Sequence, residues 1–328
     1  MGLPSSLEDL RNAIGALRVF VIGSINHDLF LHVDGRPADD CTLRVNSINR
    51  SLGGHGANCA SAAGRLGASV GLIGAVGNDE YGQLSLEDLW NCGISTQEIV
   101  TVPDVPTGFV TIPSGVGMRY MLMHRGANDA DPRVTDDALV KRAFAADVVI
   151  LMDPRPELAK NILECRARHQ SCRLVWAPGG MPSSLDLLSE YGACADAVIL
   201  NRAEFAQVKR QGLVADGASL TRPGTALIVT EGRDGAIVHD RNGVSKYPAF
   251  DVETIDATGA GDAFVAAYAL FSSIDRVSTE ECVSISSLCG ALSTTAVGAR
   301  TAHPAFAGLS LEIERRAASH LVSERAVR

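Results

Sequence analysis

The sequence lacks several patterns that would assign a protein class at once. Its eight cysteines include no CxxC pair and no Cys/His cluster at zinc spacing, so we expect buried thiols in a reducing compartment rather than disulfides or metal ligands. No apolar run reaches the roughly 18 residues that a membrane helix needs, and the N-terminus has no secretory signal pattern. These absences predict a cytoplasmic protein without a membrane partner.

Basic runs and the common nucleotide-binding motifs are missing as well. The sequence has 29 Lys and Arg residues and 38 Asp and Glu residues. The resulting net charge of −9 argues against a nucleic-acid partner. Neither GxxxxGK[ST] nor GxGxxG occurs, so any nucleotide must bind by another route. Long linkers and internal repeats are absent too. A hydrophobic content of 46% in 328 residues is ample for a large core, and we expect one domain over 1–328.

What the sequence does contain is a regular alternation of apolar strands and helices. The N-terminal third predicts helices at 5–17, 57–66 and 80–91, with strands at 18–23 and 69–75. Further buried strands are predicted at 148–152, 174–176, 197–200 and 226–230, with helices between them. Continuous apolar strands that alternate with helices predict an α/β fold with a mostly parallel sheet covered on both faces.

Two weakly alternating segments, at about 28–50 and 106–125, fall outside this rhythm. Their period of two suits exposed β-hairpins better than core strands. We expect them to form a small β lid over the carboxyl edge of the sheet, because ligands of open α/β sheets bind there.

The strongest functional signal is Asp256-Ala257-Thr258-Gly259-Ala260-Gly261-Asp262. It follows a strand-like run at 249–255 and precedes an apolar helical run, so Gly259, Ala260 and Gly261 are expected at a helix N-terminus that attracts anions. A carboxylate beside such a turn would repel a bound anion. Asp262 makes sense there if it takes a proton from a hydroxyl while the amides hold the phosphoryl group that the hydroxyl attacks. Otherwise the glycines only make the turn and Asp262 is an ordinary first-turn aspartate.

This segment resembles the C-terminal signature of the ribokinase-like (PfkB) carbohydrate kinases. A second signature of that family is matched upstream by Gly53-Gly54-His55-Gly56-Ala57-Asn58, and lesser motifs match from Gly23 to Gly298-Ala299. The resemblance implies a ribokinase-like fold and transfer of the ATP γ-phosphoryl group, with Mg²⁺, to a sugar hydroxyl. Asp262 would be the base and the turn at 259–262 the anion hole. A nucleoside kinase of the same fold and a catalytically inactive sugar or nucleotide sensor are the alternatives.

The substrate residues that the resemblance implies are Asn26, Asp28, Gly53, Gly54, His55 and Asn58. Carboxylate and amide groups on one loop can bind vicinal hydroxyls, although an Asn/Asp-rich turn and a tightly packed strand–helix turn would show the same residues. Ribokinases usually carry Lys in place of His55 and Gln in place of Cys59, which weakens ribose as the specific substrate. Their ribose-contacting Glu has no clear counterpart in Asp153-Pro154-Arg155.

The nucleotide and metal residues that the resemblance implies are Asn201, Glu204, Thr230, Gly232 and Gly235. Glu204 would hold Mg²⁺ through water, although Asn201 and Glu204 equally suit a helix cap. Asp256 and Thr258 would coordinate a monovalent cation, usually K⁺, and Ser287 stands where many relatives have Asn beside the adenine.

Arg119 and Arg125 fall on the second lid segment, just before Gly126-Ala127-Asn128. Either could reach a phosphate, and solvated lid arginines are the expectation. The lid edges of relatives often pair between subunits, so a homodimer through the lid is a possible partner arrangement.

Overall fold

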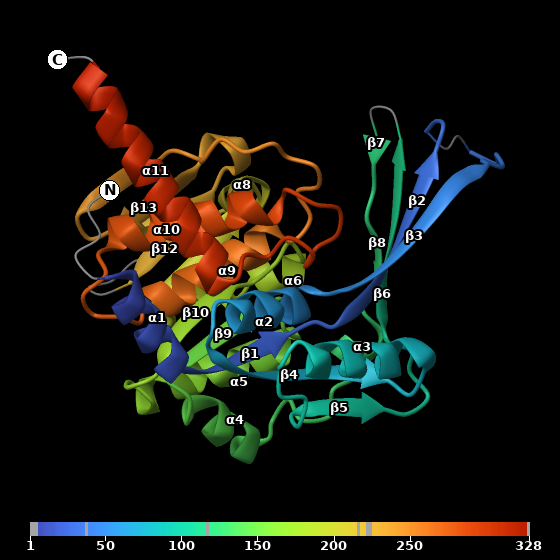
Figure 1. Cartoon of the computed structure of the whole chain (residues 1–328). Helices are drawn as coiled ribbons and strands as arrows, with labels where there is room; N and C mark the ends of the chain where they lie inside the picture. Colours follow the sequence, from blue (N-terminus) through green and yellow to red (C-terminus); the bar gives the residue numbers. More distant parts are fainter. Residues whose placement is uncertain (1–5, 37–38, 116–117, 215–216, 221–224, 327–328) are drawn as a thin grey trace.

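Two β-sheets organise the chain (Figure 1). The computed structural model describes residues 6–36, 39–115, 118–214, 217–220 and 225–326. The larger sheet has the strand order β14-β13-β12-β11-β10-β9-β1-β4-β5. Its strands are β1 (Arg18–Gly23), β4 (Ser69–Gly77), β5 (Ile99–Val102), β9 (Val148–Met152), β10 (Arg173–Ala177), β11 (Ala197–Asn201), β12 (Ala226–Thr230), β13 (Ala236–Asp240) and β14 (Gly243–Tyr247). All pairs are parallel except β12–β13 and β13–β14. The predicted, mostly parallel sheet is thus confirmed.

Helices cover both faces of this sheet, as the continuous apolar strands require. One buried cluster includes residues of α1 (Leu7–Ala16), α2 (His55–Arg65), α3 (Glu80–Asn91), α9 (Ala260–Phe271), α10 (Thr279–Ser293) and α11 (Phe306–Ala326). The cluster on the other face includes residues of α4 (Asp137–Phe144), α5 (Pro156–Cys165), α6 (Pro182–Leu185), α7 (Leu188–Tyr191) and α8 (Arg202–Arg210). None of the described helices combines the length and apolarity needed to cross a membrane.

The smaller sheet contains both segments that fell outside the βα rhythm. Its strands are β2 (Asn26–Val33), β3 (Val45–Gly53), β6 (Gly108–Gly115), β7 (Met118–Arg119) and β8 (Leu122–His124). β2 pairs antiparallel with β3 and parallel with β6, and β7 and β8 both pair with β6. Because β2 begins three residues after β1 ends, this sheet starts at the carboxyl edge of the larger one and stands out from it (Figure 1).

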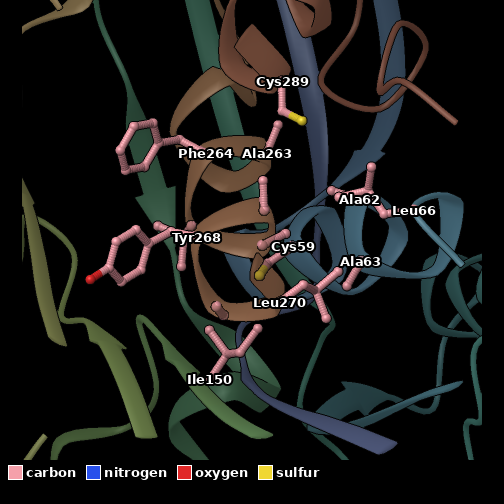
Figure 2. Packing of buried hydrophobic residues seen from close by; sticks show 14 of the residues in the cluster. Cys59, Ala62, Ala63, Leu66, Ile150, Ala263, Phe264, Tyr268, Leu270 and Cys289 are labelled. Carbon is pink, nitrogen blue, oxygen red and sulfur yellow. The ribbon is translucent and has the colours of Figure 1, made fainter. Parts of the chain in front are cut away.

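Small side chains pack helix α2 against helix α9. In Figure 2, Cys59 and Ala63 of α2 lie beside α9, whose Ala263 is also buried. Helices with such small side chains at their contact can approach closely, and larger ones there would cost about 1–3 kcal/mol through overpacking. This contact brings the N-termini of two helices that are some 200 residues apart in sequence to one place.

One predicted strand is wrong. The run at 249–255 has no regular secondary structure. Instead of pairing with a strand, the backbone N–H groups of Ile255 and Asp256 donate to the Thr294 carbonyl at the end of α10, at 2.8 and 3.0 Å. These backbone N–H groups are therefore paired with a helix terminus rather than with a neighbouring strand, and none of residues 249–255 is fully buried.

Candidate active site

The glycine turn before α9 is fixed on one side and open on the other. Gly259 caps the helix with φ +82°, and a Cβ there would overlap the carbonyl oxygen of Ala299. Only glycine fits both the left-handed conformation and this close approach. Gly261 has no atom within 4 Å of the position its Cβ would take, so a ligand can approach the turn there. The turn therefore presents N–H groups at a helix N-terminus to open space.

Asp262, directly after Gly261, is bound by two residues of the upstream signature, His55 and Asn58, at the start of α2. Its Oδ1 lies 2.8 Å from His55 Nδ1, and its Oδ2 accepts a hydrogen bond from Asn58 Nδ2 at 2.8 Å. The carboxylate is buried, whereas the imidazole remains about half exposed. The two sequence signatures thus form one site. The negative charge of Asp262, and to a smaller extent those of Asp153 and Glu204, raises the pKa of His55.

Asp28 on β2 is the next carboxylate of the site. It is buried, and a Cβ at the facing Gly53 would overlap its Oδ2. Burial raises the pKa of Asp28 to about 6, although the positive charges of His55 and Arg300 oppose the shift. Its Oδ1 is buried without a hydrogen-bond partner, as is Oδ1 of Asn58. A buried acceptor without a hydrogen bond lowers the stability of the protein, so each of these two oxygens favours a ligand that can donate a hydrogen bond to it.

Asn26 has a structural contact that the sequence did not reveal. Its Oδ1 accepts a hydrogen bond at 2.9 Å from Nδ2 of Asn128, on η1 (Gly126–Asp129). Asn128 also bonds both the N–H and the carbonyl of Ile25. Gly54, at φ +92°, leaves room for this same connection, because a Cβ there would meet the backbone of residues 24–26. The link between β1 and β2, which carries Asn26 and Asp28, is therefore held on two sides.

Asp153, directly after β9, is a site residue that motif matching missed. It is buried, takes φ +48°, and leaves Oδ1 without a partner. A left-handed conformation is strained for a non-glycine residue and is often found at functional sites. The sequence signal was present in the Asp-Pro-Arg stretch, but the shorter side chain did not match the Glu of relatives.

The expectation that Arg125 is solvated is wrong. Its side chain is only 11% exposed; Nη1 donates to Asp153 Oδ2 at 2.8 Å, and Nε donates to Asp129 Oδ1 at 2.7 Å. Arg125 thus neutralises the buried Asp153. Burial raises the pKa of Asp153 and the guanidinium charge opposes that shift. The side chain of Arg119 lies outside the described part of the chain.

Replacing Arg125 with methionine should destabilise the fold by about 3–5 kcal/mol, because it leaves the Asp153 carboxylate buried without its cation. When the pKa of a carboxyl group is higher in the folded than in the unfolded protein, the folded state loses stability as the pH rises above the unfolded-state pKa. The variant should therefore be more stable at pH 5 than at pH 8. Urea unfolding at several pH values measures both effects. Lys160→Met, which breaks an exposed pair with Glu164, is the matched control and should change little. Equal losses in the two variants would contradict the argument.

A cavity of about 670 Å³ adjoins the turn. It lies over β12, α9 and α10, and the predicted residues that line it are Thr230, Gly232, Gly235, Ala260, Gly261 and Ser287. Asn201 and Glu204 are not among its lining residues. Asn201 and Glu204 form a reciprocal capping box at the start of α8, so the helix-capping role that the sequence also suggested is observed. Burial raises the pKa of Glu204, and the hydrogen bond from the Asn201 N–H and the positive charge of His55 oppose that shift.

Asp256 ties the turn to the loop that follows α10. Its Oδ1 accepts hydrogen bonds from the N–H of Thr258 at 3.0 Å and from Thr258 Oγ1 at 2.6 Å. Its Oδ2 accepts from the N–H of Gly298 at 3.0 Å. Since Gly259 packs on Ala299, these bonds hold the backbone of the turn against the loop that contains Gly298 and Ala299.

A buried carboxylate beside an open anion-binding turn, next to a cavity large enough for a nucleotide, defines a phosphotransferase with an alcohol group as acceptor. The particular family follows from comparison with known proteins. The chain belongs to the pfkB family of carbohydrate kinases, whose model matches residues 16–305.

Individual relatives agree with this assignment. An ATP-dependent ribose-1-phosphate kinase from Halopiger xanaduensis is 31% identical over 91% of this chain and 99% of its own length. The crystal structure of ribokinase from Thermotoga maritima has a TM-score of 0.77 at 26% identity, over 91% of this chain and 99% of that one. A nucleoside kinase from Burkholderia thailandensis, in complex with inosine, shares the fold with a TM-score of 0.76 at 22% identity, over 90% and 98% of the two chains.

Proposed function

We propose that this carbohydrate kinase transfers the γ-phosphoryl group of ATP to a hydroxyl of a neutral, hydroxyl-rich sugar. The observation that carries the substrate class is the set of unpartnered buried atoms. Oδ1 of Asp28, Asn58 and Asp153 are all acceptors. Sugar hydroxyls donate hydrogen bonds, whereas a phosphate or carboxylate group has no donor to offer. A neutral polyol therefore satisfies all three oxygens at once.

The reaction needs one proton acceptor and one phosphoryl-binding element, and the site has both. Asp262 would take the proton of the attacking hydroxyl while the N–H groups at 259–262 hold the oxygens of the transferring group. The hydroxyl oxygen forms the new bond to phosphorus, and ADP leaves with the electrons of the broken bond. Positioning and electrostatic stabilisation supply most of the catalysis in such reactions. The smaller sheet would close over the sugar and exclude water.

Enzymes of this family use ATP with Mg²⁺. We propose that the adenine and ribose occupy the cavity beside Thr230, Gly232 and Gly235. The described residues include no group of three or more His, Cys, Asp or Glu side chains that could hold a metal. That fits Mg²⁺, which keeps several waters and binds nucleotide phosphates with few protein ligands. The Glu204 carboxylate would hold such waters. A K⁺ ion near Asp256 and Thr258 would add positive field to the turn.

Subunit pairing and location are further parts of the proposal. The smaller sheet exposes large apolar side chains, including Ile48 on β3 and Leu122 on β8, which supports a homodimer through the lid. The need for ATP is consistent with the cytoplasm.

A second candidate function is a nucleoside kinase. The lid face that carries Asp28 also presents Phe30, since alternate residues of a strand share a face, and Phe30 is paired with Ile112 across β2 and β6. An apolar lid surface of this kind could contact a base attached to the sugar. If this chain used ribose 1-phosphate, the substrate in the name of one relative, the phosphate group of that substrate would have to lie away from the three unpartnered acceptors.

The test is ADP release from MgATP against pentoses, hexoses, ribose 1-phosphate and nucleosides, with and without K⁺. We expect turnover on free sugars, with KM values below those for the phosphorylated sugar. Turnover on nucleosides alone would favour the second candidate. A preference for ribose 1-phosphate would overturn the neutral-substrate argument. Failure with every compound, together with binding of sugar or nucleotide, would leave only a sensor.

A further inference from the structure

His55 interacts electrostatically with four acidic side chains proposed for the site and contacts one of them, Asp262, directly. It is the first residue of α2, and its backbone N–H donates to Ser24 Oγ at 3.1 Å, which fixes its position. Its charge acts on four carboxylates that come from different elements: Asp28 on β2, Asp153 after β9, Glu204 on α8 and Asp262 on α9. A positive ring surrounded in this way keeps both of its protons near neutral pH.

The two ring nitrogens of His55 have different surroundings. Nδ1 lies 2.8 Å from the buried Oδ1 of Asp262, while 54% of the side chain is exposed. Because Nδ1 sits against the buried carboxylate, the exposed part of the ring is the opposite edge, which carries Nε2. The contact with Asp262 places the ring beside the last residue of the turn at 259–262.

The arginines that act on these carboxylates are already engaged. Arg125 binds Asp153 and Asp129. Arg300 donates to Asp88 Oδ2 at 2.6 Å and to the Leu52 carbonyl at 3.2 Å. The chain also lacks the lysine that P-loop enzymes direct at the phosphates. Of these three cations, His55 is the one that contacts Asp262, so its second N–H lies beside the proposed base.

We propose that His55 is a catalytic residue: its Nε2–H donates a hydrogen bond to the phosphoryl group during transfer, while its Nδ1–H holds Asp262. This inference rests on the proposed kinase function and adds a residue to it. The ring keeps both protons throughout. The hydroxyl proton goes to Asp262, and the positive ring stabilises negative charge on the phosphoryl oxygens, as a preorganised donor does in other transfer reactions.

The decisive variant is His55→Asn. An asparagine amide can replace Nδ1 as a donor to Asp262 but has no counterpart of Nε2, so it separates the two contacts. We expect kcat to fall roughly a hundredfold, as when one oxyanion donor is removed, with the sugar KM little changed. His55→Lys restores a positive donor and should recover part of kcat. A near-normal kcat in His55→Asn would show that His55 only positions Asp262. A raised sugar KM with normal kcat would make it a substrate contact, and either result overturns the proposal.

Two further measurements separate catalysis from a purely structural role. Binding of ADP with aluminium fluoride and sugar should weaken in His55→Asn by about the same factor as kcat, while ATP binding stays unchanged. Because the nearby carboxylates raise the pKa of His55, wild-type kcat should decline only as the pH rises well above 6.5, the ordinary value, and His55→Lys should lack that decline at the same pH. Equal analogue binding by both proteins would contradict the inference. If the wild type turned over no compound, the kinase function itself would fail before this question arose.

Discussion

Asp262→Asn should lower kcat by at least about a hundredfold, the usual contribution of a positioned base. The substitution preserves the shape of the side chain but removes its ability to accept the hydroxyl proton. Steady-state ADP release with the best sugar of the panel measures the loss. KM for ATP should change little, because the turn and the cavity that hold the nucleotide remain intact.

The matched control is Asp275→Asn, which changes an exposed aspartate shortly after α9 and should leave kcat unaffected. Thermal unfolding should show that both variants are folded. If Asp262→Asn kept more than about a tenth of wild-type kcat, another group would have to be the base. In a sensor, by contrast, the wild type would bind ligand without turnover.

Gly259→Ala and Gly261→Ala should have opposite effects on stability and both should reduce activity. At Gly259 the φ of +82° and the overlap with Ala299 force the backbone to move. Strain of this kind costs about 1–3 kcal/mol, and the displaced turn should lose nearly all activity. At Gly261 the added methyl meets nothing, and alanine in a helix is up to about 1 kcal/mol more favourable than glycine.

The Gly261→Ala protein should therefore be as stable as the wild type or more so, yet lose kcat because the methyl group occupies the space proposed for the phosphoryl group. Melting temperature and kcat of the two variants give the comparison. A fully active Gly261→Ala enzyme would show that the phosphoryl group does not lie against this turn. An unchanged melting temperature in Gly259→Ala would show that the turn is more adaptable than its contacts suggest.

Electrostatics sets a limit on which substrates this site can accept. Four carboxylates interact electrostatically with His55, and the cations that act on them are His55, Arg125 and Arg300, two of which are held by other acidic side chains. A second negative group on the sugar would be repelled unless it lay outside this cluster. The substrate panel with free and phosphorylated sugars tests this balance directly.

The sequence by itself determined the class of fold and the positions of six of the nine strands of the large sheet; β5, β13 and β14 were not predicted. Apolar runs such as Val148–Met152 are buried on both faces, and that burial follows from composition alone, because a parallel sheet covered by helices leaves no polar position in its strands. The run at 249–255 largely alternates apolar with polar residues, which also suits a strand, but backbone N–H groups at its end bond to the end of α10. Local pattern does not specify the partner of a backbone group, so this prediction failed.

The candidate site also combines residues that the sequence indicated with contacts that it did not reveal. Two motifs indicated Asp262, the glycine turn and the residues of the upstream signature, because glycine and carboxylate requirements at a helix N-terminus are local. Only the tertiary structure decided that His55 and Asn58 bind the two oxygens of Asp262, and that Arg125 turns inward to Asp153. Those contacts join residues 28 to 207 positions apart. They depend on the packing of α2 against α9 and on the path of the chain after β8, which no local spacing encodes.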